Sequence, residues 1–181
     1  MSATKQPSTL PHGLPVIKRY VTDHDGHGKA IFTKRIADDL MFKDLQDLPF
    51  EGANGAYAKS SLGYATNEFP TTLEKGADIG VYEDSLINRP GVYNPNGTIL
   101  RYLDIPPSSL SPTHRTKSLD YGILIEGAVL AKLDSGEERL LHRGDVVIQR
   151  GTNHSWKNAS STEWARMIFI LMDSKENPLS N

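Results

Sequence analysis

The stretch PTHRTKSLDYGILIEG, residues 112–127, decides the fold of this chain. Successive side chains of a β-strand point to opposite faces, so alternate residues share a face. One face would carry mostly small polar or ionisable groups, namely His114, Thr116, Ser118, Asp120 and Gly122. Because the apolar run GILI follows directly, we expect this polar face to line the interior of a β-barrel instead of meeting solvent.

Short extended segments separated by turn residues continue on both sides of this stretch. GTILRYLDI precedes it, and the later segments lie around residues 128–134, 138–142, 145–150, 154–158 and 164–173. Turns are expected at Glu126-Gly127, Asp134-Ser135-Gly136 and Arg143-Gly144. Several short strands with evenly spaced turns indicate a sandwich or barrel, not a helical fold. Residues 97–173 are therefore predicted to form an all-β barrel core.

Residues 15–96 are predicted to form an extension packed on this barrel. The β-rich runs Val16–Thr22 and Lys29–Thr33 flank Asp25-Gly26, which is a turn signal, so we expect a β-hairpin there. An amphipathic piece over residues 37–48 predicts one or two helical turns ending before Pro49.

The rest of the extension carries weaker signals. Residues 56–66 alternate well enough for a strand. Residues 67–96 are rich in Pro, Gly, Asn and Asp, so we expect a long surface excursion with one short strand at 76–84. The polar ends, 1–14 and 174–181, are predicted to be tails.

Composition and charge exclude several classes of function. The chain has 181 residues, 38% of them hydrophobic and 23% charged, which is typical of a soluble globular domain. A net charge of −2 with no basic block disfavours nucleic acid as a partner. No apolar run reaches membrane-spanning length or looks like a secretory signal, so we expect a cytoplasmic protein. Cysteine is absent, which excludes disulfides and thiolate chemistry.

Two motifs in this sequence resemble those of the cupin family. In the first cupin motif, His-x-His is followed three or four residues later by Glu and, six residues after that, by Gly. Here His114, Thr116, Asp120 and Gly127 occupy those four positions in turn. The stretch GDVVIQRGTNHSWKN resembles the second cupin motif. Gly144, His154 and Asn158 match that motif, while Arg150-Gly151 replaces its Pro-x-Gly turn.

The resemblance covers about residues 97–173 and implies a fold. That fold is the cupin double-stranded β-helix, a jelly-roll barrel, here with an N-terminal β-hairpin extension and a few short helical turns. HRTxSxDY paired with GDxVxQRGTxH is similar to small cupins of fungal and bacterial secondary metabolism. Because one scaffold hosts many reactions, the fold alone leaves the function open.

The resemblance also implies an optional metal site. Full cupin sites use three histidines and a glutamate, whereas this chain has Thr116 in one histidine position and a shorter carboxylate. His114, Asp120 and His154 remain, and such a set resembles a facial triad with open positions. One divalent iron, manganese, zinc or nickel ion would suit it. No organic cofactor is expected.

Without a metal, the same three residues can perform proton chemistry. A histidine beside a carboxylate in a partly buried pocket is oriented by it and tuned toward neutral pH. His154 or His114 would act as the base, with Asp120 fixing its tautomer or acting as an acid. The alternative is a hydrogen-bonded polar cluster that only supports the structure.

Several neighbours are expected to bind the substrate. Thr116 and Ser118 share the polar face, Trp156 has the parity of His154, and Gln149 precedes a turn from which it can point inward. Arg101 would suit a substrate carboxylate or enolate if it faces the interior. Each has a duller alternative, such as core packing for Trp156 or an external salt bridge for Arg101.

These observations favour an enzyme of lyase or isomerase type that acts on a carbonyl-containing, aromatic or polyketide-like metabolite. Isomerisation, dehydration, cyclisation and decarboxylation all fit acid–base chemistry. A non-catalytic ligand-binding cupin and a metal-dependent dioxygenase are the alternatives. We also expect a homodimer, since the hairpin from Val16 to Thr33 could add to the sheet edge of a partner.

Overall fold

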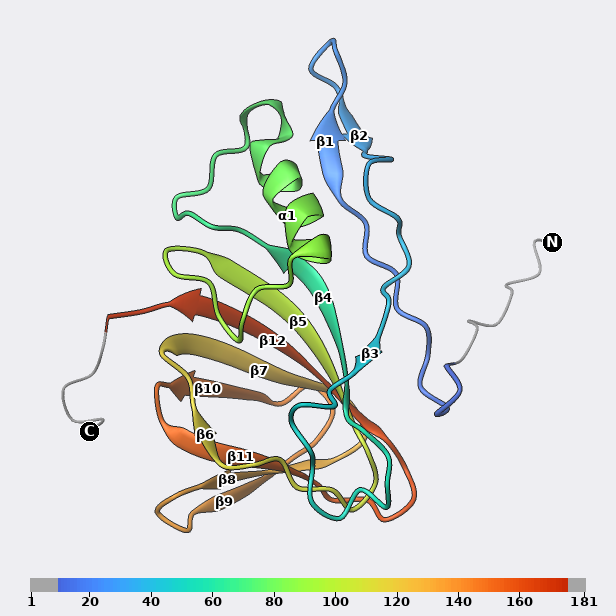
Figure 1. Cartoon of the computed structure of the whole chain (residues 1–181), viewed down its shortest axis with the longest axis vertical. Helices are drawn as coiled ribbons and strands as arrows, with labels where there is room; N and C mark the ends of the chain where they lie inside the picture. The colour runs from blue at the N-terminus through green and yellow to red at the C-terminus, as the bar shows by residue number, and fades with distance from the viewer. Residues whose placement is uncertain (1–9, 176–181) are drawn as a thin grey trace.

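A computed structural model describes residues 10–175, in which two antiparallel β-sheets face one another as a barrel (Figure 1). The larger sheet consists of β3 (Lys43–Asp44), β4 (Lys59–Ala65), β5 (Thr98–Ile105), β7 (Ser118–Glu126), β10 (Val146–Arg150) and β12 (Ala165–Asp173). Its spatial order is β10-β7-β12-β5-β4-β3. The sequence-based prediction of an all-β barrel is confirmed.

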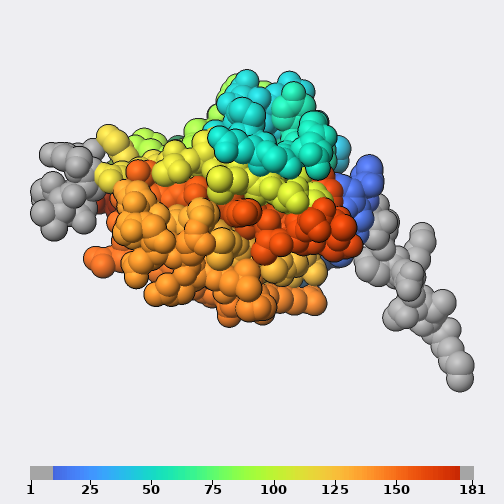
Figure 2. Space-filling view, turned by 90° about the horizontal axis from the view of Figure 1, so that it is seen from below, coloured from blue at the N-terminus to red at the C-terminus, as the bar shows by residue number. Residues whose placement is uncertain are grey.

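The smaller sheet closes the barrel on the other side. It consists of β6 (His114–Arg115), β8 (Val129–Leu133), β9 (Glu138–Leu141) and β11 (Asn153–Asn158), in the order β6-β11-β8-β9. Figure 2 views the molecule from this side, with β8 and β9 in orange at the near surface. Gly127 makes the turn from β7 to β8 with φ of 81°. A Cβ there would lie 2.9 Å from the Cβ of Ala165, so the close approach to β12 also requires glycine.

The core fills the space between the two sheets. Alternate residues of β12, namely Ala165, Met167, Phe169 and Leu171, are buried in it. The ring of Phe169 passes over Gly122 of β7, where an added Cβ would lie 2.9 Å from Cε1 of that ring. The glycine therefore gives an aromatic side chain room inside the barrel.

The N-terminal hairpin is confirmed, with shorter strands than the sequence suggests. It consists of β1 (Thr22–His24) and β2 (Ala30–Phe32), which pair as a separate two-stranded sheet. Figure 1 shows it beside α1 on the β4 side of the molecule, away from the smaller sheet. The homodimer that we expect from this hairpin stays a prediction, as does a cytoplasmic location. No helix within residues 10–175 is long and apolar enough to cross a membrane.

The strand predicted over residues 76–84 is wrong, because these residues form a helix. A short 3₁₀ turn, η1 (Glu74–Gly76), leads into α1 (Ala77–Ile87). The helix buries Ile79, Tyr82 and Ser85, which recur every three residues on one face. The Tyr82 hydroxyl donates a hydrogen bond to the Leu62 carbonyl of β4 over 2.8 Å, so tertiary packing overrides the weak helix propensity of Gly80 and Val81.

The helical turns predicted over residues 37–48 are also wrong. Ile36 and Leu40 are buried four residues apart, which imitates helical spacing. The backbone here is extended and pairs with the segment before the hairpin. Arg19 N donates to Asp38 O and Leu40 N donates to Ile17 O, over 2.7 and 3.0 Å. Lys43–Asp44 then forms β3 against β4.

The N-terminal arm is attached to the outer face of the larger sheet. Of the predicted tails, residues 1–9 and 176–181 lie outside the described residues. Leu14 is buried, and His12 Nε2 lies 2.8 Å from Asp104 Oδ2. Arg166 of β12 meets the same carboxylate in a fork, with Nε 2.5 Å from Oδ1 and Nη2 2.6 Å from Oδ2. Arg166 and Asp104 have no exposed surface.

Arg166→Met tests whether this buried pair holds the sheet together. The free energy of unfolding should fall by about 3–5 kcal/mol, because Asp104 would stay buried without its ionic partner. Urea denaturation followed by tryptophan fluorescence measures the change. Arg139→Met on the exposed strand β9 is the matched control and should change stability by less than about 0.5 kcal/mol. Equal effects of the two substitutions would contradict this role. The double variant Arg166→Met/Asp104→Leu should regain much of the loss.

Candidate functional site

The polar face predicted from residue 114 to residue 122 spans both sheets. His114 belongs to β6 of the smaller sheet, and Ser118 begins β7 of the larger one. The chain crosses between the sheets at residues 116 and 117, which lie outside any strand. Thr116, Ser118, Asp120 and Gly122 are buried, His114 is half-buried, and Arg115 and Lys117 are exposed. The predicted alternation of interior and exterior side chains therefore continues where the chain passes from one sheet to the other. Both sheets bury the same set of alternate residues in one barrel interior.

Two histidines lie side by side on the smaller sheet. His154 of β11 is the direct cross-strand partner of His114, and their ring centroids are 4.4 Å apart. His114 Nδ1 lies 3.0 Å from the Pro112 carbonyl oxygen, and His154 Nδ1 lies 2.9 Å from that of Thr152. A carbonyl oxygen only accepts, so each Nδ1 carries the hydrogen and each Nε2 keeps its lone pair.

Asp120 faces this pair from the larger sheet. The Thr116 hydroxyl donates a hydrogen bond to Oδ2 of Asp120 over 2.7 Å. The residue in the second ligand position of the motif is therefore a hydrogen-bond donor to the carboxyl group. The other oxygen, Oδ1, is buried and has no hydrogen-bond partner within residues 10–175, and the same is true of the Ser118 hydroxyl. Buried polar atoms are nearly always paired in folded proteins, so these two are candidates for binding a ligand.

Burial sets the protonation of both groups. It lowers the pKa of His154 to about 4, although the bond to the Thr152 carbonyl opposes this, and the nearby His114 lowers that pKa further. Burial also raises the pKa of Asp120, against the opposing effects of hydroxyl donation and of His114. At neutral pH the site therefore has an uncharged imidazole facing a carboxyl group that holds its proton more tightly than usual.

The other predicted neighbours lie on the same interior surface. Gln149 of β10 pairs with Asp120, is 2% exposed, and accepts a hydrogen bond from the Thr152 hydroxyl. Trp156 is 2% exposed, and its ring and that of His154 meet edge to face at a centroid distance of 5.2 Å.

Sequence reasoning missed Phe169, whose ring centroid lies 5.5 Å from that of Trp156. The alternation within ARMIFILMD could have placed Phe169 on the interior face.

The donor set fits a metal ion only in part. The two Nε2 atoms are suitable ligands, but Thr116 engages one oxygen of Asp120. Among residues 10–175, no three His, Asp or Glu side chains converge in the arrangement of a metal site. The metal inferred from the sequence is therefore kept as a proposal, and no reaction step is derived through it.

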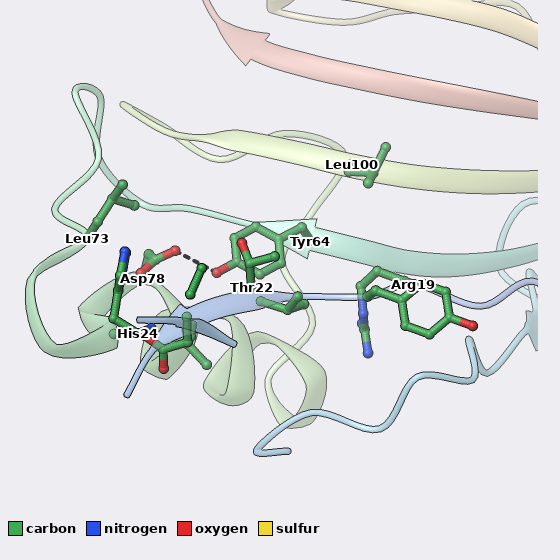
Figure 3. A pocket seen from close by; sticks show the side chains of 13 residues that line it. Arg19, Thr22, His24, Tyr64, Leu73, Asp78 and Leu100 are labelled. Carbon is green, nitrogen blue, oxygen red and sulfur yellow. Dashed lines mark hydrogen bonds between the residues drawn. The ribbon is translucent and has the colours of Figure 1, made fainter. Parts of the chain in front are cut away.

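A cavity lies outside the barrel, at a place that no sequence pattern indicates. Its volume is about 570 Å³, and it opens between β1, the start of α1 and the outer face of β4 and β5 (Figure 3). The Tyr64 hydroxyl donates a hydrogen bond to Asp78 Oδ2 at its wall over 2.6 Å. Burial, followed by this carboxylate, raises the pKa of Tyr64. None of the site residues predicted from the sequence lines this cavity.

Several fungal proteins are similar in sequence to this chain. The chain is 41% identical over 157 residues to phomopsin biosynthesis cluster protein D of Diaporthe leptostromiformis, covering 87% of this chain and 78% of that protein. It is 36% identical over 166 residues to a cupin-domain-containing oxidoreductase of Aspergillus ruber, covering 91% and 76% of the two chains. No protein-family profile matches the chain.

Solved structures of low identity resemble the fold. A cupin-2 domain protein of Rhodospirillum rubrum aligns with a TM-score of 0.47 at 14% identity, covering 77% of this chain and 72% of that one. The fungal relatives named above are much more similar in sequence, and their alignments cover most of both chains. One of them is named for its cupin domain. Some relatives are named for fungal biosynthesis clusters and others as cupin-domain-containing oxidoreductases, and this chain belongs to the cupin family.

Proposed function

We propose that this chain is an enzyme of secondary metabolism that moves a proton on a carbonyl-containing small molecule held inside the barrel. The neutral, oriented imidazole of His154 is the observation that carries the proposal. The names of the relatives support the biosynthetic setting, since three of them are named for the phomopsin and oryzine clusters. Isomerisation, dehydration, cyclisation and decarboxylation remain the candidate outcomes of this chemistry.

His154 is assigned the role of general base. Its Nδ1–H is held by the Thr152 carbonyl, so Nε2 is the atom that accepts a proton. A pKa of about 4 keeps this nitrogen unprotonated throughout the physiological range. Removal of a proton from the carbon beside a carbonyl would leave the electron pair as an enolate, whose oxygen needs a hydrogen-bond donor.

Asp120 is assigned the role of that donor. Thr116 supplies a hydrogen to Oδ2, so a proton carried by Asp120 resides on Oδ1, the oxygen without a partner among the described residues. A buried carboxyl group with a raised pKa can donate to an enolate oxygen or return the proton at another carbon. One proton taken by His154 and one given by Asp120 balance the step, and exchange with water restores both groups.

Trp156 and Phe169 would position the substrate by contact with its flat apolar part. The two rings pack against one another next to His154 and exclude water from the reacting carbon. Gln149, Thr116 and Ser118 supply short polar groups on the same surface. An aromatic or polyketide-like carbonyl compound suits such a lining.

His154→Gln tests the base in the organism that makes the protein. Replacing the native gene with this variant should lower the cluster product by about a hundredfold or more, because general base catalysis contributes roughly 10²–10⁴-fold to a rate. Mass spectrometry of extracts gives the mass of the precursor that accumulates. A difference of zero, of one water or of one carbon dioxide identifies isomerisation, dehydration or decarboxylation respectively.

His142→Gln is the matched control, since His142 is an exposed residue on the turn after β9. It should leave the product at its normal level. Unchanged product in the His154→Gln strain would contradict the proposal and favour a ligand-binding protein without catalysis.

The lowered pKa of His154 also predicts a pH dependence of stability. Between its unfolded pKa of about 6.5 and its folded pKa of about 4, the unfolded chain binds a proton that the folded chain rejects. The free energy of unfolding should therefore fall as pH falls through this window, by up to about 3 kcal/mol. The free energy of unfolding, measured by denaturation at several pH values, should depend less on pH in His154→Gln than in the parent. Asp120 is present in both proteins, so its own contribution is the same in each. Parallel curves for variant and parent would contradict the lowered pKa.

The second candidate function is a metal-dependent oxidoreduction, with dioxygenase chemistry as one form of it. Two observations favour it: the paired Nε2 atoms of His114 and His154, and the name oxidoreductase carried by several relatives. This function would appear in the metabolite comparison as a change of two hydrogens or of oxygen atoms.

Elemental analysis and metal titration of the purified protein test this candidate. One equivalent of iron, manganese, zinc or nickel that is lost in His114→Gln and retained in His142→Gln would support it. Less than about a tenth of an equivalent after loading with each metal and removal of the excess would contradict it, since a metal that supports the reaction has to stay bound to the protein.

A further inference from the structure

Arg101 is an arginine on the interior surface of the barrel. It lies on β5, where its cross-strand partners are Phe169 on β12 and Leu62 on β4. Phe169 in turn pairs with Gly122 of β7. Direct cross-strand partners share a face of the sheet, and Phe169 and Leu62 both belong to the core. The guanidinium therefore shares the interior with Asp120 and His154, as alternation along the strand had allowed.

No carboxylate within residues 10–175 forms an ion pair with Arg101. Its Nη2 donates to the Gly91 carbonyl over 2.7 Å, while its Nε is buried and has no hydrogen-bond partner in the described chain. β7 carries two carboxyl groups, Asp120 on its interior face and Glu126 at its end, opposite Arg166 of β12. Asp120 accepts from Thr116, and Glu126 lies 3.5 Å from Arg143.

A second cation, Arg89, lies near Arg101 and adds to the unbalanced positive charge there. Burial lowers the pKa of Arg101, and the positive charge of Arg89 lowers it further. Arg89, just after α1, is exposed and forms no salt bridge with a described residue. Arginine keeps its charge in proteins, so a positive potential remains at this end of the barrel. A structural arginine would normally have a carboxylate beside it; an arginine without one is placed to bind an anion.

We propose that the substrate of this site is an organic carboxylate whose anionic group binds Arg101 while its reacting carbon lies at His154 and Asp120. This inference rests on the proposed function and adds the class of substrate to it. The guanidinium can bind a carboxylate through two parallel hydrogen bonds, and its unpaired Nε is one donor of such a fork.

The two ends of the site are far enough apart for a whole molecule. β12 lies between β5 and β7, so Arg101 and the strand of Asp120 are separated by two strand spacings, or roughly 10 Å. Phe169 lies between them in the same row and faces Trp156. A carboxylate at one end, a flat apolar middle and a carbonyl at the other end would complement the site.

Thermal unfolding and calorimetric titration of the full chain test the proposal. The probes are benzoate, 3-phenylpropanoate and indole-3-carboxylate, each compared with its neutral amide at equal ionic strength. At least one carboxylate should raise the melting temperature of the parent protein more than its amide does. For that carboxylate, Arg101→Met should weaken binding by about ten- to a hundredfold, and Arg101→Lys by less, because lysine keeps the charge without the fork.

Arg139→Gln is the control for general charge effects, because Arg139 is an exposed cation on β9 and its loss should not change the affinity. The proposal is overturned if no carboxylate exceeds its amide in the parent, or if Arg101→Met binds the carboxylate as well as the parent does. The comparison of carboxylate with amide needs no variant, so it decides the matter even if Arg101→Met does not fold.

The same titration with His154→Gln separates this inference from the proposed function. That variant should bind the carboxylate within about threefold of the parent, since the imidazole is neutral and adds little charge–charge attraction. Carboxylate binding together with normal product in the His154→Gln strain would overturn the catalytic proposal alone. Loss of product without any carboxylate preference would overturn the substrate class alone.

Discussion

The buried fork between Arg166 and Asp104 is the interaction on which the geometry of the site depends. It joins β5 to β12 at a register pair in the middle of the larger sheet. The side chains at alternate positions of the same two strands, Arg101 and Phe169, point to the opposite face, into the barrel. A slip of one residue would turn every side chain of a strand to the wrong face. A charged pair with two matched hydrogen bonds therefore fixes which residues reach the site, and the arm at His12 covers the pair from outside.

The cost of burying charge acts on three groups of the interior in different ways. It keeps His154 neutral, with a pKa of about 4, and it raises the pKa of Asp120. Arg101 does not lose its proton, so it bears the cost of burial as a charged group without a carboxylate partner among residues 10–175. A fold selected only for stability would pair or remove such a cation, because an uncompensated buried charge is destabilising. A bound anion would offset this cost, which links substrate binding to stability.

Much of the fold and of the candidate site could be predicted from the sequence. Strand parity from His114 to Gly122 correctly separated interior from exterior residues, because burial follows alternation even where the chain passes from one sheet to the other. The errors lie where tertiary contacts decide. Residues 37–40 are extended because residues 17–19 supply their hydrogen bonds, and residues 77–87 are helical because Tyr82 docks on β4. The missing partner of Arg101 depends on which carboxylates lie nearby in space, and a single sequence does not record this.

Thr116 shows how one substitution can change the chemistry of an inherited scaffold. A histidine at this position would present a second imidazole nitrogen beside His114, as the cupin motif suggests. The threonine hydroxyl instead donates to Oδ2 of Asp120 and leaves Oδ1 as the oxygen without a partner among the described residues. That hydrogen bond favours the charged carboxylate, yet burial has the larger effect on the pKa of Asp120. The carboxyl group is therefore held in one orientation by Thr116, and burial makes it hold its proton more tightly than an exposed aspartate does. A proton donor requires both properties, whereas a metal ligand requires the charged carboxylate.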